Sequence, residues 1–102
     1  MTSILGHNYI GGRRSANGNV QMQSLDATTG EPLPARFFQA SEAEVDAAAK
    51  AAAAAYPVYR NLSAEKRATF LDAIADEIDA LGDEFVATVC RETALPAGRI
   101  QG

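Results

Sequence analysis

The stretch that decides the fold runs from Ser41 to Pro96 and reads SEAEVDAAAKAAAAAYPVYRNLSAEKRATFLDAIADEIDALGDEFVATVCRETALP. It opens with a capping box, in which the Ser41 hydroxyl accepts from a helical amide and Glu44 reaches back to the start of the helix. Pro57 is expected to end this first helix at about Tyr56. One helical face then carries apolar residues that permit a close-packed neighbour, namely Val45, Ala48, Ala49, Ala52, Ala53 and Tyr56.

Two more helices are predicted after the short connection of residues 59–62. Ser63 is the N-cap candidate of the second helix, and Gly82 is expected to break or bend it. Asp83 is then predicted to cap a third helix over residues 84–92, which the sequence of residues 93–96 stops. A further element can begin within residues 97–102. The two apolar stripes are Phe70, Leu71, Ile74, Ile78 and Leu81 in the second helix and Phe85, Val86, Val89 and Cys90 in the third.

Residues 1–40 are predicted to form short strands and turns. A strand over residues 7–14 bends at Gly11-Gly12, where positive φ or a close approach of another backbone is expected. Asn17-Gly18 is a strong hairpin signal. Residues 20–25 alternate weakly, as a strand does, and a turn follows in which Gly30 takes the left-handed conformation. Residues 33–39 can return as a third strand, which Pro34 restricts to an edge or to its start. The sequence therefore predicts an α+β segment: an antiparallel meander over residues 1–40, then three helices in residues 41–102.

The composition suits a segment that completes its core against something else. A length of 102 residues fits one small domain or a fragment of a larger one. The apolar fraction is 47%, but much of it is alanine, and the chain has no Trp, four Phe and three Tyr. Such a chain buries little apolar area to offset its conformational entropy.

The charge and the cysteine content indicate which classes of partner are disfavoured and in which cellular compartment the protein is expected. Residues 41–102 carry eleven acidic and six basic side chains, so phosphates of nucleic acid or anionic lipid are disfavoured as partners. A single cysteine cannot form an internal disulfide. Residues 1–12, MTSILGHNYIGG, lack the basic start and the long apolar run of a secretory signal. No window of the sequence is long and apolar enough for a membrane-spanning helix. We therefore expect a soluble cytoplasmic protein.

No complete catalytic, metal-binding or phosphate-binding motif is present. Cys90 lies on an apolar stripe without a base nearby in sequence, so a structural role is favoured. His7 has no clustered partners for a metal. The glycines match neither GxGxxG nor GxxxxGK. The acidic cluster lacks the loop of a calcium site and is interpreted as a solvated helix face: Asp72, Asp76, Glu77, Asp79, Asp83 and Glu84. The predicted set of catalytic, cofactor-binding and metal-ligating residues is therefore empty.

The order of features nevertheless resembles the start of the aldehyde dehydrogenase superfamily. The resemblance rests on HNYIGG, the TGE turn, FFQASEAEVDAAAKAAAAAYPVY and ADEIDALGDEFVATVCRETALPAGRI, and it covers about residues 7–102. Within the superfamily, these stretches of sequence are most similar to those of the α-ketoglutaric semialdehyde (2,5-dioxovalerate) dehydrogenases. Family members are several times longer, so residues 1–102 would be one segment of the cofactor domain.

The resemblance implies an enzyme that uses NAD or NADP and forms homo-oligomers. A cysteine thiolate would attack the aldehyde, hydride would pass to the nicotinamide, and a glutamate would activate water to hydrolyse the thioester. Those residues, the oxyanion-hole asparagine and the cofactor site lie beyond the equivalent of Gly102. Cys90 does not match the motif of the nucleophile, nor Glu92 that of the base. The segment would be an inactive scaffold that packs against the remainder of the dehydrogenase chain.

An alternative from another class stays open at this point. The same pattern fits a free-standing helical module that binds a partner protein through its alanine-lined face and has no enzymatic activity.

Overall fold

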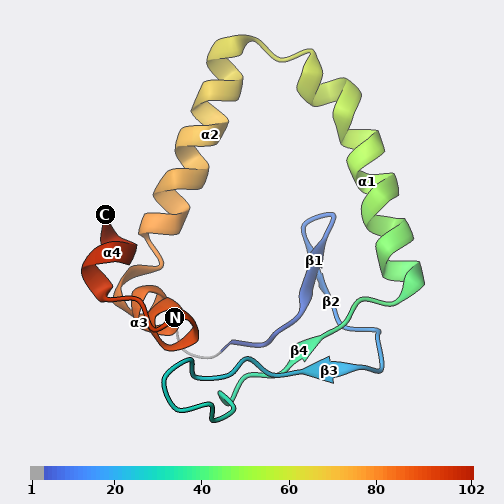
Figure 1. The fold of residues 1–102 in the computed structure, drawn as a ribbon. Helices are drawn as coiled ribbons and strands as arrows, with labels where there is room; N and C mark the ends of the chain where they lie inside the picture. The colour runs from blue at the N-terminus through green and yellow to red at the C-terminus, as the bar shows by residue number, and fades with distance from the viewer. Residues whose placement is uncertain (1–3) are drawn as a thin grey trace.

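The computed structural model describes residues 4–102 and shows short strands followed by helices (Figure 1). The α+β fold class is therefore confirmed. The elements in chain order are β1 (Asn8–Ile10), β2 (Arg13–Ser15), β3 (Gln21–Met22), β4 (Phe37–Phe38), α1 (Glu42–Arg60), α2 (Ala64–Asp79), α3 (Gly82–Thr93) and α4 (Ala97–Gln101).

The strands form two antiparallel pairs, β1 with β2 and β3 with β4. The hairpin turn is Gly11-Gly12, with φ of 59° and 78°, because a two-residue turn of this hand needs positive φ at both positions. The predicted hairpin at Asn17-Gly18 is wrong: this dipeptide connects the two sheets. Glycine is needed there for a close approach, since a Cβ on Gly18 would lie 1.9 Å from the Gln39 carbonyl oxygen.

The turn predicted between residues 20–25 and 33–39 is confirmed and lies between β3 and β4. Asp26 Oδ1 accepts from the Thr28 and Thr29 amides at 2.8 and 3.0 Å, and Gly30 has a φ of 77°. The turn is tied to the helical half by a hydrogen bond of 2.8 Å from the Ala27 amide to the Arg91 carbonyl of α3. Residues 26–32 thus connect the strands to α3.

Helix α1 begins as predicted and ends later. Ser41 Oγ accepts from the Glu44 amide at 3.2 Å, and Glu44 Oε1 accepts from the Ser41 amide at 3.0 Å, which confirms the capping box. The predicted end at Tyr56 is wrong, because the helix continues through Pro57 to Arg60. Proline removes one helical donor, but this part of α1 is exposed, so water can reach the carbonyl left without a partner. Asn61 then closes the last turn by donating to the Pro57 carbonyl at 2.7 Å.

Helix α2 is capped by Ser63, whose hydroxyl accepts from the Lys66 amide at 3.2 Å, as predicted. The predicted cap at Asp83 is wrong. The N-cap position of α3 is Leu81, which is already in the right-handed helical region, and no side chain caps this end. Asp83 lies instead in the first turn, where the helix dipole favours a carboxylate. The predicted stop is confirmed at Ala94, with a φ of 60°.

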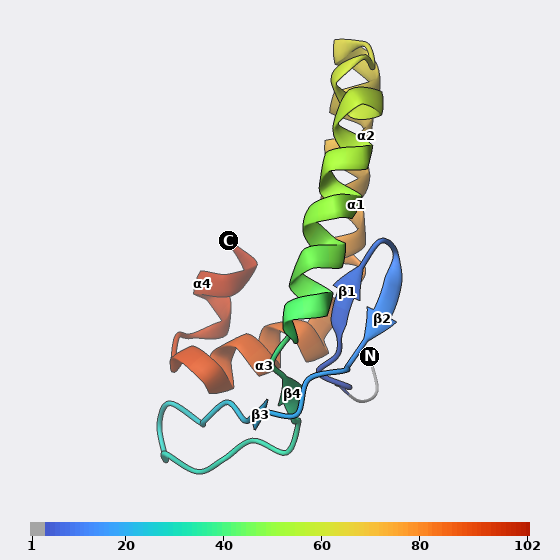
Figure 2. The same ribbon diagram turned by 90° about the vertical axis from the view of Figure 1, so that its right-hand side faces the viewer.

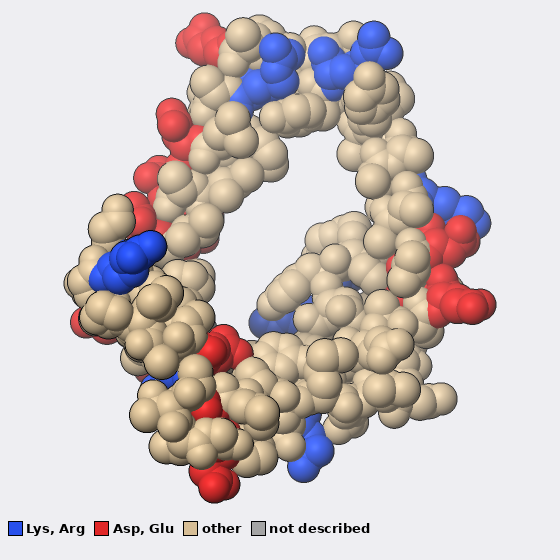
Figure 3. Space-filling view, in the orientation of Figure 1, with Lys and Arg blue, Asp and Glu red and all other residues tan. Residues whose placement is uncertain are grey.

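The helices build an open arch rather than a packed domain. Helices α1 and α2 are its two arms, and they overlap in one thin layer when the molecule is turned (Figure 2). The extents are 48 × 36 × 19 Å, and the radius of gyration is 16.8 Å, against about 13 Å for a compact domain of this length. Side chains leave the space between the arms open (Figure 3).

Within residues 4–102 no hydrophobic side chain is buried, and Glu44 alone is shielded from solvent. The described part of the chain therefore has no hydrophobic core of its own. None of the helices in this part is long and apolar enough to cross a membrane. The prediction that residues 1–12 are no secretory signal falls partly on residues 1–3, outside the described residues.

Candidate functional site

The structure places the thiol and the imidazole that the sequence offers for chemistry on separate elements, the thiol of Cys90 on α3 and the imidazole of His7 just before β1. Cys90 is half-buried on α3 beside the similarly protected Val86 and Val89. The His7 ring contacts Phe38 edge-on, with ring centroids 5.5 Å apart, and no hydrogen bond joins it to Cys90. Across residues 4–102, no group of three or more His, Cys, Asp or Glu side chains could hold a metal ion.

The acidic cluster of α2 and α3 is exposed, as the interpretation of a solvated face requires. Acidic side chains follow the outer edge of α2, away from the opening of the arch (Figure 3). Within the described residues, their arrangement offers no shared cation site.

The best-shielded polar side chain among the described residues is Glu44, which is only 3% exposed. The Ser15 hydroxyl, at the end of β2, donates to Glu44 Oε2, while the Ser41 amide donates to Oε1. The carboxylate therefore joins the β1–β2 hairpin to the first turn of α1. The sequence indicated the capping role of Glu44 but not the contact with Ser15, which lies 29 residues away.

The Ser15 hydroxyl, followed by the Ser41 amide, lowers the pKa of Glu44 from 4.5 to about 2. These donors stabilise the ionised carboxylate more than burial destabilises it. A carboxylate with such a low pKa is a poor general base at neutral pH, and donors of its own chain already occupy it. Glu44 is therefore a structural anchor.

This anchor predicts a specific pH dependence. Because the pKa is lower in the folded than in the unfolded chain, the stabilisation is complete above about pH 5 and is lost as the pH falls through about 2. We expect amide exchange in the first turn of α1 to reveal this transition after correction for intrinsic rates. Glu44→Gln has no carboxylate at this position and should show no such transition. An unchanged acid profile in Glu44→Gln would contradict the assignment.

A second carboxylate with a lowered pKa is Asp26. The Thr29 amide is the main cause, the Thr28 amide follows, and Arg91 contributes a weaker attraction. These partners belong to the turn and to α3, so this carboxylate stabilises the local structure.

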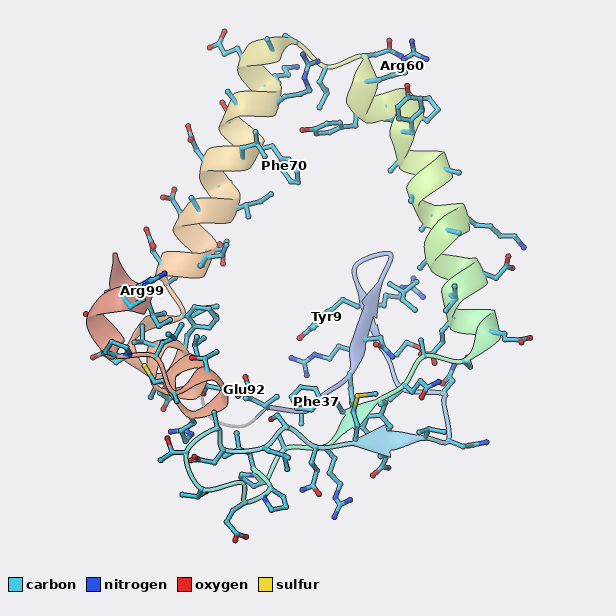
Figure 4. The ribbon with its side chains drawn as sticks, viewed as in Figure 1. Tyr9, Phe37, Arg60, Phe70, Glu92 and Arg99 are labelled. Carbon is cyan, nitrogen blue, oxygen red and sulfur yellow. The ribbon has the colours of Figure 1, made fainter. Side chains whose placement is uncertain are left out.

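A hollow at the base of the arch gathers residues from distant parts of the chain. It contains the polar side chains His7 and Arg14 but no carboxylate or thiol that could act as base or nucleophile. Tyr9, on β1, points from here toward the opening (Figure 4). The hollow thus offers a largely apolar packing surface. The sequence did not indicate it, because it combines the first strand with the residues that follow α2. Its lining consists of Ile4, Leu5, Gly6, His7, Tyr9, Arg14, Phe37, Ala80 and Leu81.

Comparison with known proteins places this scaffold in a family. Residues 14–102 match the aldehyde dehydrogenase family. The chain is 39% identical over 102 residues, its full length, to the α-ketoglutaric semialdehyde dehydrogenase of Acinetobacter baylyi. It is also 39% identical over 100 residues, 97% of its length, to α-ketoglutaric semialdehyde dehydrogenase 2 of Azospirillum brasilense.

A third relative is the 2-hydroxymuconic semialdehyde dehydrogenase of Pseudomonas sp. strain CF600, with 37% identity over 83 residues, 80% of this chain and 17% of that protein. The chain spans 19% of the length of each of the two α-ketoglutaric semialdehyde dehydrogenases. No solved structure matches significantly. The match to the family covers most of the sequence, and we conclude that the chain belongs to the aldehyde dehydrogenase family.

Proposed function

We propose that residues 1–102 are one N-terminal structural segment of an NAD- or NADP-dependent dehydrogenase that oxidises α-ketoglutaric semialdehyde (2,5-dioxopentanoate) to 2-oxoglutarate. The observation that carries this proposal is the 39% identity, over essentially the full chain, to two relatives named for that substrate in two organisms. We propose further that the enzyme is cytoplasmic and homo-oligomeric.

The role of this segment is mechanical rather than chemical. Its two carboxylates with lowered pKa are engaged by their own chain, and its thiol and imidazole have no catalytic neighbours among the described residues. We therefore assign no catalytic, cofactor-binding or metal-ligating residue to residues 1–102. The nucleophilic cysteine, the general base and the nicotinamide site belong, in this proposal, to the four fifths of the enzyme that this chain does not span.

The test compares the pure 102-residue chain with the protein encoded by the complete reading frame. We expect the longer protein to reduce NAD+ or NADP+ with α-ketoglutaric semialdehyde, and to prefer this aldehyde over 2-hydroxymuconic semialdehyde. The 102-residue chain should give no reduction, because thiohemiacetal formation needs an activated thiol. Nucleotide reduction by the pure 102-residue chain would overturn the proposal.

A free-standing interaction module is the second candidate, because the exposed apolar side chains of α1 and α2 would also suit a partner protein. Whether the reading frame continues past Gly102 distinguishes the enzyme segment from the interaction module. A frame that continues past Gly102 to a cysteine in a glycine-rich context favours the enzyme. A stop codon there, together with a compact monomer in solution, favours the module.

A further inference from the structure

We propose that the apex of the arch is a preformed elbow, which fixes the angle between α1 and α2 by contacts of its own. The elbow is defined as residues 57–70, from the last turn of α1 to the second turn of α2. This inference goes beyond the proposed function, because it holds whether the segment belongs to a dehydrogenase or binds another protein.

The two arms need such a device because no hydrophobic core holds them in place. Helices α1 and α2 diverge from the apex (Figure 1), and the space between them stays open in the space-filling view (Figure 3). No hydrophobic side chain is buried within residues 4–102. Two helices joined only by a flexible connection would sample many angles, so a single angle requires contacts close to the connection.

The first contact of the elbow is made by Arg67. Its guanidinium Nη1 donates to the Leu62 carbonyl at 2.5 Å, and both residues are half-buried although their direct neighbours in the chain are exposed. Leu62 in turn donates from its amide to the Tyr59 carbonyl at 3.1 Å. A charged donor makes a stronger hydrogen bond than a neutral one. The Arg67 side chain therefore ties α2 firmly to the backbone that leaves α1.

Aromatic and capping contacts complete the elbow. The rings of Tyr59 and Phe70 pack edge to face, with centroids 5.8 Å apart, and so join α1 directly to α2. On the α1 side, Asn61 donates to the Pro57 carbonyl at 2.7 Å. On the α2 side, the Ser63 hydroxyl caps the first turn. Each end of the connection is thus fixed to its own helix, and the ring pair holds the two helices together.

The base of the arch offers a rival explanation for the angle. There, the Ala27 amide donates to the Arg91 carbonyl of α3 at 2.8 Å, which closes the arch between the strands and the helices. If this contact set the angle, the apex would be free to bend. The apex, however, acts on both arms directly, whereas the base reaches them only through α3 and the strands.

The experiment measures the distance between the arms by pulsed electron paramagnetic resonance. Spin labels are attached in the 102-residue chain at two exposed positions, Ala49→Cys on α1 and Asp76→Cys on α2. Cys90→Ser removes the natural thiol, so that no other site is labelled. This labelled parent chain should give a single narrow distance distribution.

Two neighbouring substitutions test the contact of Arg67. Arg67→Ala should widen the distribution at least about twofold, because the Leu62 carbonyl loses its charged donor. Lys66→Ala is the matched control, since it removes the same charge from an exposed side chain one residue earlier, and it should leave the width unchanged.

Two further variants distinguish the apex from the base. Phe70→Leu keeps an apolar side chain but removes the ring contact, so it should widen the distribution while circular dichroism shows the helices retained. It also decides the question if Arg67→Ala loses helix. Ala27→Pro removes the donor at the base, at a position after a capping aspartate where proline is common, and should leave the distribution narrow.

Three results would overturn the elbow. The first is a broad distribution in the parent chain, which would show that the arms have no fixed angle. The second is an unchanged width in Phe70→Leu. The third is a widening by Ala27→Pro that equals or exceeds that of Phe70→Leu, because the base of the arch would then set the angle.

Discussion

Alanine at Gly6 should speed the amide exchange of Phe38 by at least about thirtyfold, which corresponds to about 2 kcal/mol of local stability. Gly6 has a φ of 70°, and an added Cβ would lie 1.8 Å from the Arg36 carbonyl oxygen and 2.8 Å from the Phe37 Cα. These are backbone atoms, so no side-chain rotation removes the collision. The hydrogen bond of 3.0 Å from the Phe38 amide to the Gly6 carbonyl must then break.

Gly30→Ala is the matched control for this prediction. Gly30 also has positive φ, at 77°, but an added Cβ would meet nothing within 4 Å. It therefore carries the left-handed strain without the collision, and the Phe38 amide should change by less than about threefold. Equal effects of the two substitutions would show that strain alone governs this region and would contradict the close approach at Gly6.

Glu44→Ala is expected to separate the β1–β2 hairpin from α1. The substitution removes the acceptor of both the Ser41 amide and the Ser15 hydroxyl, in the most protected part of the described chain. Polar groups that lose their partner in a protected place are costly, so the first turn of α1 should fray. We expect the Ser41 amide to exchange at least about tenfold faster, measured by hydrogen–deuterium exchange at neutral pH.

Two further variants isolate the cause. Glu42→Ala removes the same charge from the same first turn, but this side chain is exposed, so the Ser41 amide should be little affected. Glu44→Gln keeps an acceptor oxygen and should lose less protection than Glu44→Ala. If Glu42→Ala and Glu44→Ala behaved alike, the helix dipole rather than the buried anchor would explain the effect.

Interactions that span a few residues were predictable from sequence. The caps at Ser41 and Ser63, positive φ at Gly11 and Gly12, and the turn at Asp26 all depend on neighbours within five residues. The same local rules gave wrong predictions at positions where more than one of them could apply. At Pro57 the helix continued because an exposed turn tolerates a missing donor.

The functional interpretation came from resemblance, because the sequence contains no complete catalytic, metal-binding or phosphate-binding motif. Nothing in the spacing of the residues indicated that Ser15 would donate to Glu44, or that the first strand and the residues after α2 would share a hollow. Such contacts depend on where whole elements are placed.

The sequence by itself determined the succession of strands and helices, because hydrophobic period, caps and glycines act over one or two turns. The tertiary structure decided which side of each helix is protected from solvent. Around α1, Glu44, Ala48 and Ala51 are its more protected residues, whereas Val45, on the predicted apolar face, stays 60% exposed. Which side is protected depends on contacts between residues that are distant in the sequence. The two arms of the arch, α1 and α2, make too few such contacts to build a core.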